Sequence, residues 1–132
     1  MPNTPSHLRY STDHIWAKEQ EGQSVVRIGV TDFAQEALGD VIDVTLPQVG
    51  DDVQAEVACA DVESTKSVSD VVSPVSGTVV ARNEGLAGSP ELVNSDPYEQ
   101  GWLLDIEVDP SKATAELAAL QDAGAYARAT GG

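Results

Sequence analysis

The residue whose surroundings most suggest chemistry is a lysine in the middle of the chain. Lys66 stands in the segment Val62-Glu63-Ser64-Thr65-Lys66-Ser67-Val68-Ser69-Asp70. Small polar residues flank the lysine, and β-forming residues lie outside them on both sides. This pattern predicts a β-hairpin whose tip holds Lys66 out into water. The chain contains only three lysines, which makes an exposed one in this setting distinctive.

The acidic residues near Lys66 favour a role as an acceptor of a chemical group. An exposed lysine is protonated at neutral pH and is a poor nucleophile. Catalytic lysines need burial or a neighbouring cation, whereas Glu63 and Asp70 surround Lys66 with negative charge. We therefore predict that Lys66 is a substrate for enzymatic acylation and that the attached group supplies the chemistry. A solubilising surface lysine is the alternative interpretation.

The cysteine and the histidines do not form a catalytic or metal-binding pattern. Cys59 lies on the apolar phase of a predicted strand, which favours a buried packing thiol. His7 and His14 have no serine or cysteine nucleophile at a recognisable spacing. No cluster of cysteines and histidines has zinc-ligand spacing.

Two further groups of residues also have structural interpretations. Trp16 and Trp102 are predicted to be core aromatic residues. The acidic pairs Asp51-Asp52 and Glu19/Glu21 are predicted to be solvated turns, because the ligand spacing of an EF-hand is absent.

The composition limits the classes of protein to which the chain can belong. Its 132 residues carry 22 acidic and 7 basic side chains, and the formal net charge is -15 at pH 7. A field this negative repels phosphate backbones and anionic lipid heads, so we expect neither nucleic acid nor membrane partners. Hydrophobic residues make up 41% of the chain, enough for one core. We expect a single domain over residues 1–132, with its core at about 8–126 and flexible ends at 1–7 and 130–132.

The first residues do not resemble a targeting sequence. Residues 1–6 contain no basic stretch followed by an apolar one, and they are not rich in arginine. No apolar run approaches the length that spans a bilayer, and the single cysteine excludes an intramolecular disulfide. These features predict a cytoplasmic protein, and the charge favours a monomer that meets its partners transiently.

Alternating apolar and polar residues dominate the centre of the chain, as is typical of half-buried strands. Strands are expected at 15–19, 25–30, 42–46, 53–59, 68–72, 78–81 and 102–108. Turn residues separate them at Glu21-Gly22, Pro47–Gly50, Pro74–Gly77 and Asp96-Pro97. Many short strands at close spacing predict a mainly β sandwich or barrel made of small sheets.

Short helices are expected beside these strands. Asp32 is the predicted N-cap of a helix that ends at Leu38. Ser89-Pro90 is expected to open a helical turn, and Asp109-Pro110 a longer helix. The alanine-rich tail is expected to be helical as far as Ala129.

Six islands of sequence, spread over most of the chain, follow the order and spacing of one known family. They are Thr31–Asp40 with Leu46-Pro47; Val62–Lys66; Ser69-Asp70; Pro74–Gly77; Asn83 with Pro90–Asn94; and Asp96–Tyr98 with Gly101-Trp102. From about Leu8 to Tyr126 the chain resembles the glycine cleavage system H protein family of lipoyl carriers. The resemblance implies a lipoyl/biotinyl-type barrel-sandwich hybrid, mainly β with short helices and a C-terminal helical segment.

The resemblance also assigns roles to residues. Lys66 is expected to carry lipoate through a covalent N6-amide. Glu63, Ser64, Ser67 and Asp70 are expected to form the context that lipoyl-attaching enzymes recognise.

The partners implied by the resemblance are the other enzymes of glycine catabolism. The lipoyl swinging arm would take the aminomethyl group of glycine from the pyridoxal-phosphate glycine decarboxylase. It would present that group to the tetrahydrofolate-dependent aminomethyltransferase, and dihydrolipoyl dehydrogenase would reoxidise the arm. The chain itself would catalyse no step. Because the loaded arm ends in an amine, we expect acidic residues near the hairpin tip to hold that amine in a cleft.

The sequence departs from the family pattern near the N-terminus and before the hairpin. The family usually has His-Glu-Trp where this chain has His14-Ile15-Trp16, which removes a carboxylate expected to approach the loaded arm. Asp13 is the candidate replacement, although strand alternation would point it elsewhere unless the strand bulges. Ala58-Cys59-Ala60-Asp61 replaces a glycine-containing run, and Thr65, Ser67 and Val68 replace commoner Val and Ala.

Several other functions remain as alternatives. Biotin could occupy the same fold, but its motif places methionines beside the lysine where Thr65 and Ser67 stand here. The chain could relay lipoyl groups to other enzymes, or be an acidic interaction module without a cofactor. A small hydrolase using His14 is disfavoured, because the sequence shows no nucleophile, phosphate loop or metal ligands.

Overall fold

The structure is a computed structural model that describes residues 4–20 and 24–130. Its strands are β1 (Arg9–Tyr10), β2 (Ile15–Glu19), β3 (Val25–Val30), β4 (Val41–Thr45), β5 (Asp52–Val53), β6 (Ala58–Ser64), β7 (Val68–Val72), β8 (Gly77–Arg82) and β9 (Leu104–Val108). Its helices are α1 (Asp32–Leu38), the 3-10 helix η1 (Glu84–Ala87), α2 (Leu92–Ser95), α3 (Pro110–Ala118) and α4 (Ala123–Ala129). The chain is mainly β with short helices, as predicted.

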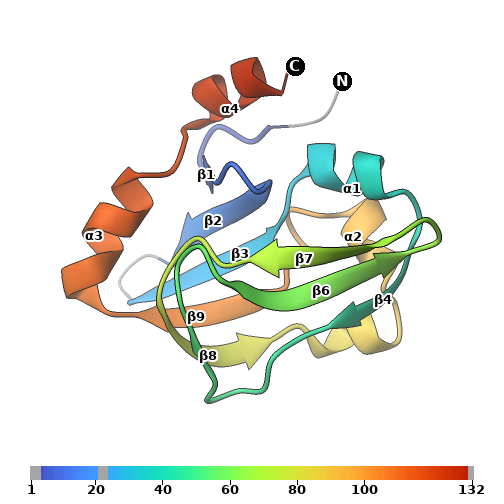
Figure 1. Cartoon of the computed structure of the whole chain (residues 1–132), viewed down its shortest axis with the longest axis horizontal. Coiled ribbons are helices and arrows are strands. Elements are labelled where there is room, and N and C mark those ends of the chain that lie inside the picture. Colours follow the sequence, from blue (N-terminus) through green and yellow to red (C-terminus); the bar gives the residue numbers. More distant parts are fainter. Residues whose placement is uncertain (1–3, 21–23, 131–132) are drawn as a thin grey trace.

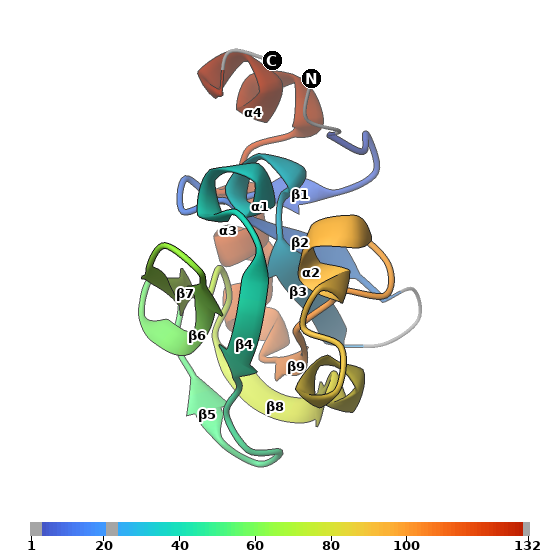
Figure 2. The same cartoon turned by 90° about the vertical axis from the view of Figure 1, so that its right-hand side faces the viewer.

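The strands form two antiparallel sheets. One sheet has six strands in the order β1-β2-β3-β9-β8-β5, and the other has three in the order β4-β6-β7. Figures 1 and 2 show the smaller sheet facing the larger one, with α1 and α4 together at one end of the molecule. This is the expected hybrid of small sheets with helices at its edges.

The main core lies between the two sheets. Val62 and Val71 of the smaller sheet and Ile28, Val79 and Ile106 of the larger one are each at most 1% exposed. A second cluster of Leu8, Tyr10, Trp16 and Tyr126 joins the two ends of the chain. Within it the rings of Tyr10 and Tyr126 stack with their centroids 4.7 Å apart.

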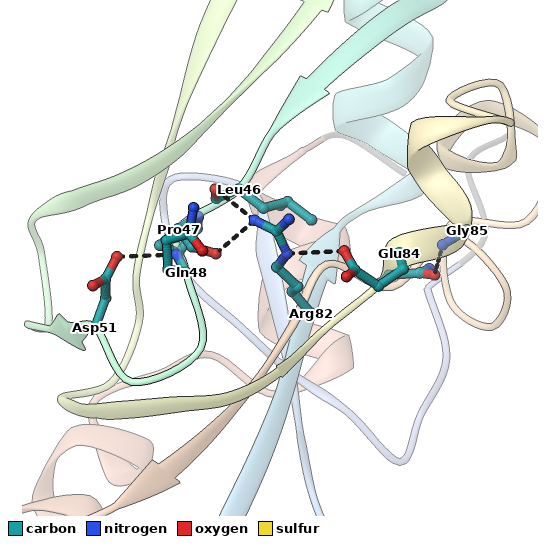
Figure 3. A network of polar contacts seen from close by, with 8 residues as sticks. Leu46, Pro47, Gln48, Asp51, Arg82, Glu84 and Gly85 are labelled. Carbon is teal, nitrogen blue, oxygen red and sulfur yellow. Dashed lines mark hydrogen bonds and ion pairs between the residues drawn. The ribbon is translucent and has the colours of Figure 1, made fainter.

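Arg82 ties the larger sheet to the loop that follows β4 (Figure 3). Its Nη1 donates to the carbonyl oxygens of Leu46 and Pro47 at 3.4 and 3.3 Å, and its Nε pairs with Glu84 at 2.9 Å. In the same loop the backbone N–H of Gln48 donates to the Asp51 carboxylate at 2.9 Å. These bonds satisfy backbone groups of the loop in which the chain leaves the smaller sheet for the larger one.

The predicted strand at 53–59 is wrong. β5 stops at Val53, and the next strand, β6, begins only at Ala58 and continues to Ser64. Glu56 has φ +69°, in the left-handed region, and its N–H donates to Ser73 O at 2.8 Å. A residue in that conformation cannot continue a strand, so the chain turns there although its apolar residues alternate.

Three other elements begin at residues other than those predicted. Thr31, not Asp32, caps α1, because its hydroxyl accepts from Ala34 N at 3.1 Å. The turn opened by Ser89-Pro90 becomes helix only at Leu92. The last strand begins at Leu104 and not at residue 102. The expected turn at Glu21-Gly22 lies outside the described residues.

The remaining expectations for the helices hold. Asp109 caps α3 ahead of Pro110, and the C-terminal helix α4 ends at Ala129 as predicted. In the part of the chain that the structure describes, no helix is long and apolar enough to cross a membrane.

Candidate functional site

Lys66 lies at the tip of a β-hairpin, as the sequence predicts. β6 and β7 pair antiparallel, and Glu63 opposite Val68 is the pairing nearest the turn. Thr65, Lys66 and Ser67 form the turn, and all three are exposed. Figure 1 shows this turn beside the connection between α1 and β4.

Ser64 shapes the turn from inside. Its side chain is buried, and its hydroxyl oxygen accepts from the backbone N–H groups of Lys66 and Ser67 at 3.2 Å each. Its own N–H donates to Ser67 O at 2.8 Å. The serine therefore satisfies the turn's backbone, and Lys66 itself stays exposed.

The hairpin is also tied to its neighbour in space. The N–H of Thr65 donates to Asp40 O at 3.1 Å. Asp40 belongs to the α1–β4 connection, so the position of the lysine depends on an element more than twenty residues earlier in the sequence.

The smaller sheet surrounds this turn with negative charge. Asp43 lies directly opposite Glu63, and Asp61 lies directly opposite Asp70. Like charges in directly opposed positions are unfavourable. One oxygen of Asp61, Oδ1, is also buried without a hydrogen-bond partner among the described residues. Asp43, Glu63 and Asp70 are exposed, so a partner that grips the tip would meet an acidic surface.

A hollow of about 280 Å³ lies next to the hairpin. Two exposed carboxylates, Asp13 and Asp70, and the polar side chains of Ser67 and Ser69 line it. Its apolar lining comes from α1 and the core, including Phe33, Ala37, Leu38, Val62 and Val71. The combination offers room for a flexible apolar chain and negative charge for a cationic end.

The replaced carboxylate position lies in this hollow. Ile15 is 2% exposed and packs into the core, so it contributes only apolar surface. Asp13 precedes β2 in a turn, in which the N–H of His14 donates to Ser11 O at 3.2 Å. Strand alternation therefore does not govern Asp13, which lines the same hollow without a bulge.

His14 takes part in a buried polar network and not in a catalytic pair. Its Nδ1 is 2.8 Å from the hydroxyl of Tyr126, which is in turn 2.8 Å from the hydroxyl of Thr31. Its ring packs on Phe33 with the centroids 4.8 Å apart. Burial lowers the pKa of His14, and the nearby Asp13 carboxylate opposes that effect. His7 is exposed in a turn.

The other residues singled out by the sequence have packing roles. Cys59 is half-buried against the core, and burial raises the pKa of its thiol to about 11. Trp16 is fully buried, as predicted, and its indole N–H donates to Pro97 O at 3.0 Å. Trp102 is only half-buried, and the guanidinium of Arg27 lies over its ring at 4.1 Å from the centroid. Within residues 4–20 and 24–130, no group of three His, Cys, Asp or Glu side chains could hold a metal ion.

Comparison with known proteins decides the family. The family model for the glycine cleavage H-protein matches residues 8–130. The chain belongs to the glycine cleavage H-protein family. Members of this family are non-catalytic lipoyl carriers of the glycine cleavage system.

Relatives match this family member along nearly its whole length. The glycine cleavage system H protein of Mycobacterium avium is 53% identical over 127 residues, which cover 96% of each chain. That of Micrococcus luteus is 52% identical over 130 residues, which cover 98% of this chain and 99% of the relative. A crystal structure of the H protein from Mycobacterium marinum matches with a TM-score of 0.85 at 38% identity, covering 96% of this chain and 98% of the other.

The structure adds residues that the sequence pattern did not single out. Gly39 and Asp40 contact the hairpin turn, Asn94 donates to Gly39 O, and Tyr126 holds His14. They belong to islands of the family pattern or to the helical tail, but their contacts join segments far apart in the sequence. No local spacing signals such contacts.

Proposed function

We propose that this chain is the covalent lipoyl carrier of a glycine cleavage system, with lipoate in amide linkage on Lys66. The observation that carries the proposal is an exposed lysine on a rigid hairpin tip in a member of the H-protein family. A carrier needs its attachment residue accessible to several enzymes in turn, and the exposed turn meets that need.

The residues around Lys66 fit the group. Thr65 and Ser67 have small side chains, so they leave the tip narrow enough to enter an enzyme's active site. Glu63, Ser64 and Asp70 complete the recognition context for the attaching enzyme. The first and last of these are exposed beside the tip, whereas Ser64 acts through the shape of the turn.

Lipoate, when attached, supplies a disulfide that accepts electrons and then carries the aminomethyl group. The protein presents the arm to the pyridoxal-phosphate glycine decarboxylase, the tetrahydrofolate-dependent aminomethyltransferase and dihydrolipoyl dehydrogenase. The chain's own contribution is to hold the attachment point and to shield the cargo. The hollow beside the tip suits the second task, because Asp13 and Asp70 favour a cation and Phe33 and Leu38 exclude water.

Intact-mass analysis after incubation with a lipoate-attaching ligase tests the attachment, and peptide mapping locates it. We expect one lipoyl group, on Lys66, in the native chain and in a Lys112→Arg control on the exposed surface of α3. The Lys66→Arg variant is expected to fold normally and to remain unmodified. A biotinyl group on Lys66, or no group in a host with active lipoylation enzymes, would overturn the proposal.

The acidic hollow has a separate test. In a chain with both Asp13→Asn and Asp70→Asn, we expect the loaded amine to be lost to water faster than in the native protein, and the rate to depend less on salt. A matched Glu91→Gln and Glu107→Gln pair, at exposed positions that do not line the hollow, is the control. Equal loss rates for the native chain and the hollow variant at all salt concentrations would show that these carboxylates do not hold the cargo.

A further inference from the structure

The connection between α1 and β4 leaves a space that the lysine side chain fills. Gly39 has φ +80° and ψ −158°, a conformation that residues with a Cβ rarely adopt. A Cβ at this position would lie 3.1 Å from Cε and 3.5 Å from Nζ of Lys66. The outer part of the lysine side chain therefore lies against the bare backbone of Gly39.

The next residue of the same connection holds the backbone of the turn. Asp40 O accepts the N–H of Thr65 at 3.1 Å. Gly39 thus contacts the side chain of Lys66, and Asp40 contacts the backbone of Thr65. If the connection moves, both the turn and the lysine must move with it.

Asn94, on α2, holds the connection from the other side. Its Nδ2 donates to Gly39 O at 2.8 Å and to Gln35 Oε1 at 3.1 Å, and its Oδ1 accepts from Val41 N at 2.8 Å. A backbone carbonyl can only accept and a backbone N–H can only donate, so these contacts fix which end of the amide is oxygen. One side chain therefore satisfies backbone groups on both sides of Asp40.

We propose that Asn94 is a positioning residue for Lys66. By fixing Gly39 and Val41, it holds Asp40 where it can accept from Thr65, and it keeps open the space in which the lysine lies. The role in acylation rests on the proposed function above, whereas the effect on the turn does not depend on it. Asn94 acts through the backbone of Gly39 and Val41, and its hydrogen bonds are not to Lys66.

The Asn94→Asp variant separates positioning from general packing. Aspartate has the same shape and keeps the oxygen that Val41 N needs, but it places a second oxygen against Gly39 O and Gln35 Oε1. Ser95→Asp, an exposed neighbour on the same helix, adds the same charge without touching the connection and is the matched control.

Two measurements on the full chain are required. The first is amide hydrogen exchange, in which Thr65 should lose protection in Asn94→Asp while Val71, buried in β7, keeps it. The second is the steady-state rate of lipoyl attachment with ligase, lipoate and ATP. ATP converts the lipoate carboxyl to an acyl-adenylate with release of pyrophosphate, and neutral Nζ then displaces AMP to form the amide and loses a proton. We expect kcat to fall about tenfold, since misplacing a reacting group is costly, and KM for the protein to stay unchanged, since Glu63 and Asp70 keep their places.

The outcomes distinguish the two proposals. Unchanged Thr65 protection and unchanged kcat in Asn94→Asp would overturn the positioning role, even if the melting temperature falls. If the native chain accepts no lipoate but Thr65 still loses protection, the proposed function fails and the positioning role stands. If Asn94→Asp does not fold, Asn94→Ala replaces it, because that change removes all three bonds of the amide without adding a charge. A fall in Thr65 protection in Asn94→Ala supports the role, and unchanged protection overturns it.

Discussion

At the residue scale, Trp16 fills a space that a glycine at position 29 leaves open. A Cβ on Gly29 would lie 2.6 Å from three atoms of the indole ring. The ring cannot move aside freely, because it is fully buried and its N–H is bonded to Pro97 O. The packing of the second core cluster therefore depends on the absence of one methyl group.

We predict that Gly29→Ala lowers the free energy of unfolding by about 1–3 kcal/mol, as overpacking of a core does. Gly88→Ala is the control, because no atom lies within 4 Å of its Cβ position. Urea denaturation of both variants measures the difference. Equal stability of the two variants would show that the ring adapts.

Some single residues of the site could be predicted from the sequence, and others could not. The Lys66 hairpin was predictable, because small polar residues between two β-forming runs are a local signal. The hydrogen bond of His14 with Tyr126 was not, because 112 residues separate the two. Asp13 was predicted as the replacement for the missing carboxylate. The turn in which Asp13 lies, where strand alternation does not apply, was not predicted.

At the scale of elements, the Thr31–Tyr126–His14 network joins α1, α4 and the turn before β2. The Tyr126 hydroxyl contacts both other side chains at 2.8 Å, and Thr31 also caps α1. Neutral His14 suits this half-buried site, because burial lowers its pKa below the ordinary value, and the C-terminal helix is thus held by a titratable group.

We predict a pH-dependent loss of stability that comes from His14. Burial lowers the pKa of His14 below its ordinary value of 6.5, so the unfolded chain binds a proton at higher pH than the folded chain does. The free energy of unfolding should therefore fall as the pH drops through about 6.5 and level off below the folded pKa. His14→Asn, which suits the positive φ at this position, should show a flatter profile above pH 5. Identical slopes for the two chains in chemical denaturation would refute this assignment.

Errors in element boundaries have the same long-range origin. The alternation at 53–59 predicted one strand, but Glu56 turns to bond Ser73 on the β7–β8 connection. Both Thr31 and Asp32 are good N-cap residues. Thr31 is the one that is buried, and its hydroxyl contacts that of Tyr126, a contact that the local sequence does not indicate. Local patterns identified most of the elements, and tertiary contacts set where they begin and end.

At the scale of the whole molecule, the acidic charge dominates. The formal net charge is -15, and the described residues contain only two salt bridges, Arg27–Asp105 and Arg82–Glu84. Amide formation at Lys66 would remove one more positive charge. The folded state must therefore tolerate considerable self-repulsion.

We predict that salt stabilises the folded protein. Raising sodium chloride from about 0.01 M to about 0.15 M shortens the screening length from about 30 Å to about 8 Å, which weakens repulsion across the molecule. The melting temperature followed by circular dichroism should rise over this range. A fall would mean that the two ion pairs outweigh the repulsion.

The carrier role of Lys66 is tested by the mass of Lys66-containing peptides from protein produced in a host with active lipoylation enzymes. The carrier role predicts a lipoyl group on Lys66, none on Lys18 or Lys112, and an unmodified Lys66→Arg variant whose stability changes by less than about 0.5 kcal/mol. An unmodified Lys66 in such a host would contradict it.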